Sequence, residues 1–273
     1  MDVAGPLISL LSDFGLRDPS AAIMRGVVLE IVPDARVVDI SHEVRKFAIR
    51  DGALLLWCAL PYLPVGFHVA VVDPGVGTTR LPIAVATARG DVLVGPDNGL
   101  LSAAAARLGG IAAVHVLEAE AFRLPKVSTS FHGRDVFAPA AAHLARGVPI
   151  ADLGRALDAA ALVPSPIADA EVHDGELRSS VVYVDTFGNV KLAGLRADLE
   201  AAIGPVSPGD RLVLAIGDRP IETSWRATFG DVAPGETLVY EDSYGRLCLA
   251  ASQASAAQVH AIEDDLAVVI RRP

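Results

Sequence analysis

The chain has 273 residues, with 23 lysines and arginines against 33 aspartates and glutamates, which gives a formal net charge of −10. Hydrophobic residues make up 52% of the chain. This is enough apolar material for a packed core, which excludes a disordered chain. The acidic balance argues against nucleic acid or an anionic membrane as partner, because both repel negative charge. The length fits one large domain or two smaller ones.

Two cysteines, Cys58 and Cys248, form neither a Cys-x-x-Cys pair nor a disulfide framework. A reducing cytoplasm is therefore the simplest compartment. Residues 1–6 lack the basic region of a signal peptide. The longest apolar stretch, residues 53–72, is interrupted by prolines, a glycine and a histidine. We interpret it as helix, turn and buried strand rather than as a membrane span.

The first half of the chain alternates short apolar runs with segments of helical spacing. Val27, Val28 and Ile31 share one helical stripe, and Pro33 ends that helix. Alternation of this kind predicts an α/β domain with a largely parallel sheet. The predicted strands are 7–11, 36–40, 67–72, 83–87, 92–94 and 113–117, and the predicted helices are 21–32, 49–60, 100–108 and 135–146.

From about Ile167 the chain consists of short β-rich segments separated by glycine-containing turns. This pattern predicts a small antiparallel β-barrel or sandwich. Residues 162–166 contain two prolines that stiffen a linker. We therefore expect an α/β domain over residues 1–163 and a smaller β-barrel domain over residues 167–273. The predicted strands are 180–184, 211–216, 237–240, 247–250 and 266–270.

Polar residues follow three predicted strands of the first half, namely Asp13, Asp73 and the pair 97–98, Asp-Asn. In an open parallel sheet, ligands collect at the carboxyl ends of the strands, where a carboxylate accepts hydrogen bonds from a ribose diol. Asp is also a common helix cap, and Asp-Asn-Gly is a common turn. We favour the turn for 97–98. For Asp13 we favour a binding role, because Phe14 and Gly15 offer a stacking face and close backbone approach.

Asp73 and Arg80 lie on either side of the turn Asp-Pro-Gly-Val-Gly-Thr-Thr-Arg, so their side chains can converge. A surface ion pair that closes this turn is an equally good interpretation. The glycines match neither a dinucleotide fingerprint nor a P-loop, so the turn does not indicate nucleotide phosphate binding.

His132 lies beside Gly133 at the predicted start of a helix, where an imidazole can face a cavity. The other six histidines have no comparable setting in the sequence. We interpret Arg134 and Asp135 as a structural ion pair or as helix-start charges. The sequence has no His-x-x-x-His pair and no Cys/His cluster, so we expect no metal site. It also has no Gly-x-Ser-x-Gly elbow, which argues against a Ser-His-Asp hydrolase.

The segment 183–189 ends a predicted strand with Asp185, Phe187 and Asn189. An asparagine amide offers a donor and an acceptor together, which matches the edge of a purine. A β-turn with a solvated asparagine is the alternative interpretation.

Five motifs follow one another from about residue 7 to about residue 270. They are Ser-Asp-Phe-Gly at 12–15, Asp-Pro-Gly-Val-Gly-Thr at 73–78, Pro-Asp-Asn-Gly-Leu at 96–100, Phe-His-Gly-Arg-Asp-Val-Phe-Ala-Pro at 131–139 and Asp-Thr-Phe-Gly-Asn at 185–189. Together they resemble the S-adenosyl-L-methionine (SAM) hydroxide adenosyltransferases, or SAM hydrolases, which are relatives of the SAM-dependent fluorinase and chlorinase. The resemblance implies an N-terminal α/β domain, a C-terminal β-barrel domain and a homotrimer. SAM would bind between the N-terminal domain of one subunit and the C-terminal domain of its neighbour.

The resemblance also implies a reaction, in which water or hydroxide attacks C5′ of SAM and yields adenosine and L-methionine. SAM is the substrate, and neither a cofactor nor a metal is implied. The Asp-Arg-His set that marks the hydrolases corresponds to Asp73, Arg80 and His132. The halogenases lack the Asp-Pro-Gly-Val-Gly turn, so its presence favours hydrolysis over halide chemistry.

The first half also carries residues that the resemblance assigns to substrate binding. Asp13 would hold the ribose hydroxyls beside Phe14, with Asp18 and Ser20 close by.

In the second half, residues 191–193, Lys-Leu-Ala, depart from the Thr-Asn that is frequent after Phe-Gly-Asn in the family.

The second half would supply the rest of the substrate site. By the same resemblance, Asp185 would meet the methionine ammonium and Ser243 the methionine carboxylate. Asn189 would meet the adenine, Phe187 would line its side, and the backbone near Gln253 would approach it.

The chemistry of SAM fits this assignment. Its sulfonium makes methionine a good neutral leaving group, so no general acid is needed. His132 or Asp73 could take the proton of the attacking water, with Arg80 holding the oxygen. Two alternatives stay open. One is an adenosine- or SAM-binding protein with little turnover, and the less favoured one is a SAM-dependent halogenase.

Overall fold

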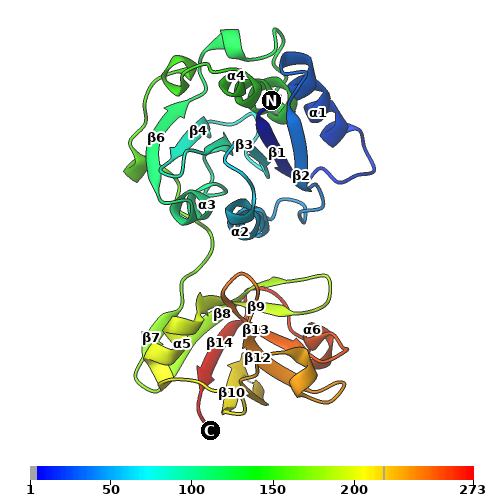
Figure 1. The fold of residues 1–273 in the computed structure, drawn as a ribbon, viewed down its shortest axis with the longest axis vertical. Coiled ribbons are helices and arrows are strands. Elements are labelled where there is room, and N and C mark those ends of the chain that lie inside the picture. The colour runs from blue at the N-terminus through cyan, green and yellow to red at the C-terminus, as the bar shows by residue number, and fades with distance from the viewer. Residues whose placement is uncertain (1–4, 218) are drawn as a thin grey trace. The chain divides into compact units, whose positions relative to one another are not determined.

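The computed structural model describes residues 5–217 and 219–273, and the chain divides into two compact units (Figure 1). The first unit ends at Pro166 and the second begins at Ile167. The division falls directly after the proline-containing segment 162–166. Among the described residues, no helix combines the length and the apolar character that crossing a membrane requires.

A six-stranded mixed sheet forms the centre of the N-terminal unit. Its strands are β1 (Leu7–Ser12), β2 (Arg36–Ser41), β3 (Phe67–Val71), β4 (Pro82–Thr87), β5 (Val92–Pro96) and β6 (Ile111–Val116). They lie in the order β2-β1-β3-β5-β4-β6. The first four are parallel, whereas β4 runs antiparallel to both of its neighbours. The predicted, largely parallel sheet is therefore confirmed. The antiparallel strand follows from the short 88–91 connection, which only antiparallel neighbours can use.

Four helices cover this sheet: α1 (Ser20–Ile31), α2 (Ile49–Ala59), α3 (Ser102–Arg107) and α4 (Ala138–Ala145). Figure 1 shows α1 and α4 on one face and α2 and α3 on the other. Each lies within about two residues of its predicted range, except that the last begins with a π-helical turn, Gly133–Phe137. Phe137 in this turn is fully buried and belongs to the same hydrophobic cluster as Ile8 and Leu10 of β1. This packing fixes the position of His132 immediately before the turn.

The C-terminal unit is an antiparallel sheet that almost closes into a barrel. Its strands are β7 (Glu171–His173), β8 (Glu176–Val184), β9 (Val190–Leu195), β10 (Arg211–Ile216), β11 (Arg219–Ser224), β12 (Thr237–Glu241), β13 (Arg246–Ala251) and β14 (Ala267–Arg271). The order is β11-β10-β14-β8-β9-β13-β12, and β7 pairs with β8. Trp225, directly after β11, forms a bridge to Val239 of β12. This contact joins the two ends of the strand order, so the predicted barrel is confirmed.

Several C-terminal elements are absent from the prediction. They are β7, β9 and β11 and two short helices, α5 (Arg196–Ile203) and α6 (Ala256–His260). In β9 five consecutive residues, Val190 to Gly194, are buried, so the strand shows no alternation of polar and apolar residues.

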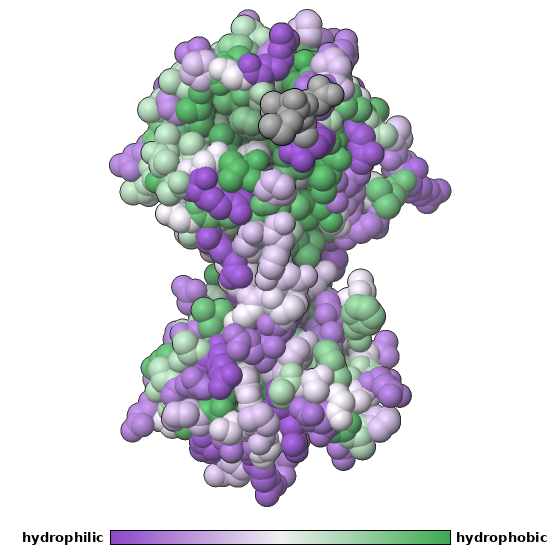
Figure 2. All heavy atoms as spheres, in the orientation of Figure 1, coloured by the Kyte–Doolittle hydropathy of each residue, from purple (hydrophilic) through white to green (hydrophobic). Residues whose placement is uncertain are grey.

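The surfaces of the two units differ in hydropathy. On the face drawn in Figure 2, hydrophobic residues gather on the N-terminal unit, whereas the C-terminal unit is mostly polar. Some large apolar side chains are strongly exposed, including Leu16 at 71% and Phe47 at 70%. The N-terminal unit thus leaves apolar side chains uncovered in the single chain.

Candidate active site

The turn between β3 and β4 brings Asp73 and Arg80 together. The Arg80 Nε lies 3.0 Å from both Asp73 carboxylate oxygens, and Nη2 donates to Oδ2. The side chains of Arg80 and Asp73 are only 10% and 5% exposed, so this is a buried pair and not the exposed surface pair of the alternative interpretation. Gly77 makes the turn possible. Its φ is +76°, and a Cβ there would lie 2.6 Å from the Thr129 carbonyl oxygen.

His132 joins this pair through its Nδ1, which lies 2.8 Å from Arg80 Nη2. A guanidinium only donates, so Nδ1 accepts, and a neutral ring then carries its proton on Nε2. Burial, reinforced by the positive charge of Arg80, lowers the pKa of His132 below the ordinary 6.5, against the opposing charges of Asp73 and Asp135. The imidazole is therefore neutral near pH 7. The π-helical turn that follows is a feature frequently found at functional sites.

A cavity of about 340 Å³ opens beside these side chains. Asp73 and His132 line it, as do Asp13 and Phe14. Asp13 is buried, and its Oδ2 accepts the backbone N–H of Phe47 at 2.9 Å. The structure thus brings four of the site residues predicted in the first half to one cavity.

Asp18 and Ser20 are not among the residues that line this cavity. Asp18 is exposed, and Ser20 is half-buried as the first residue of α1. Neither residue therefore joins the predicted residues that line the cavity.

A second cavity, of about 640 Å³, lies in the C-terminal unit. All five residues that the resemblance assigns to this half line it, namely Asp185, Phe187, Asn189, Ser243 and Gln253. The Asp185 carboxylate accepts the backbone N–H groups of Phe187 and Asn189 and the Asn189 side-chain amide, each at 2.9 Å. These bonds fix the turn after β8, so the Asn189 amide is held in place and is not merely solvated.

Sequence reasoning missed several residues that line the two cavities. Lys46 and Phe47 line the first, and Phe47 has the unusual φ of +66° for a non-glycine residue. Lys191, Asp242 and Tyr244 line the second. Lys191 was visible only as a departure from the family pattern, and nothing local marks Lys46 or Phe47 because their contact with Asp13 is tertiary.

Two groups expected to be structural are confirmed as such. Asn98 Oδ1 accepts the backbone N–H of Leu100 at 3.2 Å, which is a local turn bond. The Asp97 carboxylate accepts the Val163 N–H at 3.0 Å, and Asn98 Nδ2 donates to the Val72 carbonyl at 2.9 Å, so both side chains hold the turn against the rest of the unit. Arg134 Nε lies 2.6 Å from Oδ1 of the fully buried Asp135, which forms the expected ion pair.

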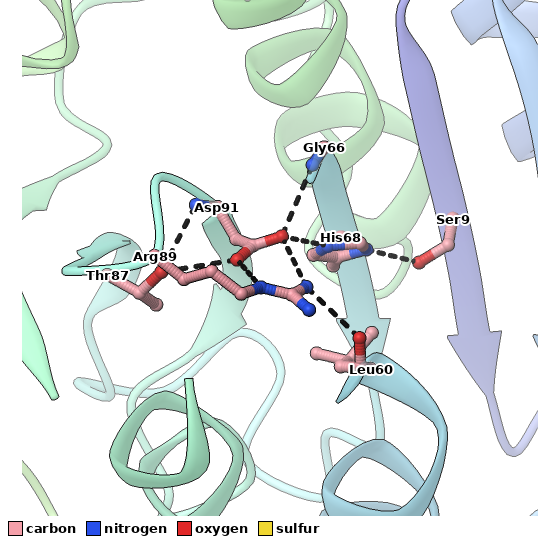
Figure 3. Close-up of polar contacts among 7 residues, drawn as sticks. All are labelled: Ser9, Leu60, Gly66, His68, Thr87, Arg89 and Asp91. Carbon is pink, nitrogen blue, oxygen red and sulfur yellow. Dashed lines mark hydrogen bonds and ion pairs between the residues drawn. The ribbon is translucent and has the colours of Figure 1, made fainter. Parts of the chain in front are cut away.

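His68 has a different setting from His132, because it lies within strand β3 in a buried polar group and not at the start of a helix. Figure 3 shows His68 on β3 between Ser9 of β1 and Asp91, with Arg89 on the other side of the carboxylate. The distances are 2.7 Å from Ser9 Oγ to Nδ1 and 3.0 Å from Nε2 to Asp91 Oδ1. Burial alone would raise the pKa of Asp91, but the bonds from His68 and Arg89 hold that pKa far below its ordinary value.

His68, Ser9 and Asp91 are at most 1% exposed and line neither cavity described above. A substrate cannot reach this serine, so the group ties the strands together and is not a nucleophile. His42 is also buried, with its Nδ1 2.7 Å from Ser12 Oγ.

Comparison with family models shows the protein family to which the chain belongs. Residues 8–154 match the SAM hydroxide adenosyltransferase N-terminal domain, and residues 179–268 match the C-terminal domain of the same family. The chain belongs to the SAM hydroxide adenosyltransferase family. The predicted family is thereby confirmed, and the five motifs recognised in the sequence lie within these two matches.

Individual members and relatives agree with this result. The chain is 45% identical to an (R)-S-adenosyl-L-methionine hydrolase of Salinispora arenicola, over 94% of each chain. It is 29% identical to a fluorinase of Actinopolyspora mzabensis, over 98% of this chain and 97% of the fluorinase. The crystal structure of an uncharacterized conserved protein from Thermotoga maritima matches with a TM-score of 0.90 and 33% identity. That match covers 97% of this chain and all of the other.

Proposed function

We propose that this family member hydrolyses SAM to adenosine and L-methionine by attack of water on C5′. The observation that carries the proposal is that Arg80 links Asp73 to His132, and that these two side chains line one cavity together with Asp13 and Phe14. The higher identity to a protein named as a SAM hydrolase than to one named as a fluorinase supports hydrolysis over halide transfer.

The substrate's own chemistry limits what the protein must supply. When the C5′–S bond of the sulfonium breaks, methionine departs as a neutral thioether, so no group has to protonate it. SAM is the substrate, and no further cofactor takes part. The enzyme must hold a water molecule in line with the C5′–S bond, and alignment of this kind can lower a barrier by roughly 7–11 kcal/mol. It must also accept a proton from that water.

Asp73 is the proton acceptor in this proposal. A carboxylate has about four acceptor positions, of which Arg80 occupies part, and it carries no proton of its own. His132 uses its Nδ1 lone pair for Arg80, and its Nε2 is then protonated. His132 would therefore orient the water by donating to it, and Arg80 would hold both partners and stabilise the developing hydroxide.

In this proposal, each of the two cavities binds a different part of SAM. Asp13 accepts from the ribose hydroxyls beside Phe14. In the other cavity Asp185 faces the methionine ammonium and Ser243 the carboxylate. The remaining residues there, Asn189, Phe187 and Gln253, surround the adenine.

We further propose a homotrimer whose site is shared between subunits. Support comes from the division of the residue set over two units and from the exposed aromatic rings of Phe47 and Phe187, at 70% and 79% exposure, that line the cavities. Large apolar side chains of this kind are common at protein interfaces. Light scattering should give three times the chain mass of 28.4 kDa. A fully active monomer would contradict the shared site.

The cytoplasm is the compartment we propose. Cys58 and Cys248 are both buried, and neither forms a disulfide bond, as expected in a reducing environment.

The direct test is incubation of the purified protein with SAM, followed by chromatography of the products. Adenosine and methionine in equal amounts support the proposal. Tight adenosine binding without either product would instead indicate a binding protein, and a halide-dependent 5′-halo product would indicate a halogenase.

A further inference from the structure

The C-terminal cavity contains a buried cation with no role in the assignments above. Lys191 lies on β9 and lines the cavity, and its side chain is only 10% exposed. Its Nζ donates to Oδ2 of Asp242 and lies 5.1 Å from the centre of the Tyr244 ring. A lysine is almost never this buried unless it is paired.

The fold does not need a charge at this position. Val190 and Leu192, on either side of Lys191, belong to the barrel core, so strand alternation turns Lys191 to the opposite face, toward the cavity. Apolar residues of similar size often replace a buried ion pair without loss of stability, because desolvation offsets the attraction between the charges. This favours a role in binding over a role in folding.

The partner of Lys191 also fixes the turn that carries Ser243. Asp242 Oδ1 accepts the backbone N–H groups of Tyr244 and Arg246, both at 2.9 Å, while Oδ2 accepts from Lys191. The ammonium and the Ser243 hydroxyl therefore belong to one rigid corner of the cavity. A cation beside a hydroxyl is a suitable site for a carboxylate.

An opposite charge is provided on the same hairpin. Asp185 follows β8, Lys191 lies on β9, and the two strands pair with Tyr183 opposite Lys191. Both charged side chains line the cavity. Besides the Lys191–Asp242 pair, the cavity thus presents a second carboxylate, so it offers a partner for each charge of a zwitterionic amino-acid group.

We propose that Lys191 recognises the carboxylate of the substrate's methionine end and makes the protein select SAM over analogues that lack this carboxylate. The inference rests on the proposed function, because it takes SAM to be the molecule in the site. It adds a specificity-determining residue that replaces part of the frequent family pattern at 191–193.

The test compares SAM with decarboxylated SAM in four proteins: the wild type, Lys191→Met, Asp242→Asn and the double variant. The measured quantity is the ratio of kcat/KM for SAM to kcat/KM for the decarboxylated analogue. Lys191→Met should lower this ratio about tenfold to hundredfold, the effect of losing one hydrogen bond to a charged group. The loss should appear in KM for SAM rather than in kcat.

The double variant separates recognition from structure. If Lys191 only neutralises Asp242, removing both charges restores the ratio, which would overturn the inference. If it binds the carboxylate, the double variant stays as unselective as Lys191→Met. An unchanged ratio in Lys191→Met also overturns it.

The failure of the proposed function has a different signature. If the wild type releases no adenosine from SAM, calorimetric Kd values for the two compounds in the same four proteins give the ratio directly. If Lys191→Met changes the ratio of the two Kd values, the inference about Lys191 is supported although the hydrolase proposal fails. If the ratio stays the same, the inference and the hydrolase proposal are both rejected.

Discussion

The division of labour between Asp73 and His132 can be tested with paired amide substitutions. In Asp73→Asn the amide oxygen can still accept from Arg80, but the side chain can no longer take a proton. In His132→Asn the amide oxygen can replace Nδ1 as the acceptor for Arg80, and the amide N–H can still donate. The two variants therefore differ mainly in whether the proton acceptor has been lost.

The contacts give the expected magnitudes. Loss of a positioned proton acceptor typically costs about 10²–10⁴ in rate, or about 3–5 kcal/mol, so kcat of Asp73→Asn should fall by that factor. His132→Asn replaces one hydrogen bond by a weaker one, a change of about 0.5–1.5 kcal/mol, and kcat should fall only about three- to tenfold. His132→Ala leaves the buried Arg80 donor without its 2.8 Å acceptor, so its loss should be larger, about ten- to hundredfold.

The assay is adenosine release at saturating SAM, with calorimetry to show that each variant still binds adenosine. Asp152→Asn is a matched control, because this carboxylate is exposed and does not line the cavity. If His132→Asn is damaged as severely as Asp73→Asn, the imidazole is the proton acceptor and the assignment is wrong. Near-normal turnover of Asp73→Asn would refute it equally.

Three further predictions concern pH, binding and stability. Because burial and Arg80 lower the pKa of His132, the acid limb of the kcat profile should lie below pH 6.5, and a limb above that value would contradict the neutral imidazole. Asp13→Asn should raise KM for SAM about tenfold or more with a smaller change in kcat, measured from initial rates, whereas an unchanged KM would remove Asp13 from the ribose site. Asp91→Asn should lower the free energy of unfolding by about 3–5 kcal/mol at pH 7, measured by urea denaturation. The folded-state pKa of Asp91 is lowered, so the extra stability of the wild type over Asp91→Asn is present above the unfolded-state pKa of about 4 and should shrink as the pH falls below it. An equal difference in the free energy of unfolding at pH 3 and at pH 7 would contradict this.

The N-terminal elements were predictable because their signals are local. Strand and helix periods show directly in the spacing of apolar residues, and Pro33 marks the end of α1. The missed C-terminal strands lack such signals. In β11, Pro220 lies on a strand at one end of the sheet order, where a missing N–H is tolerated, although a proline argues against a strand in sequence reasoning. In β9, a lysine within a fully buried run obscures the pattern.

The contents of the site were predictable only through the order of the motifs. Asp73 and Arg80 are close in sequence, so their pairing follows from the turn, but His132 lies 52 residues beyond Arg80. Its position depends on how the π-helical turn packs on the sheet. That packing rests on Phe137 and the strand order β2-β1-β3-β5, neither of which local sequence reveals.

A comparison of His68 with His132 shows why residue type alone does not identify a catalytic group. His68 has a serine and an aspartate as partners, as in a hydrolase triad, because Ser9 and His68 are paired residues on adjacent parallel strands. Its polar atoms are engaged within a closed core, so there is no room for a reacting molecule. His132 has an arginine in place of the serine and meets its carboxylate only through that arginine, but it opens onto a cavity. A group can act on a substrate only where it keeps both access and an unused hydrogen-bonding direction, and in this unit that condition separates Asp73 and His132 from Asp91 and His68.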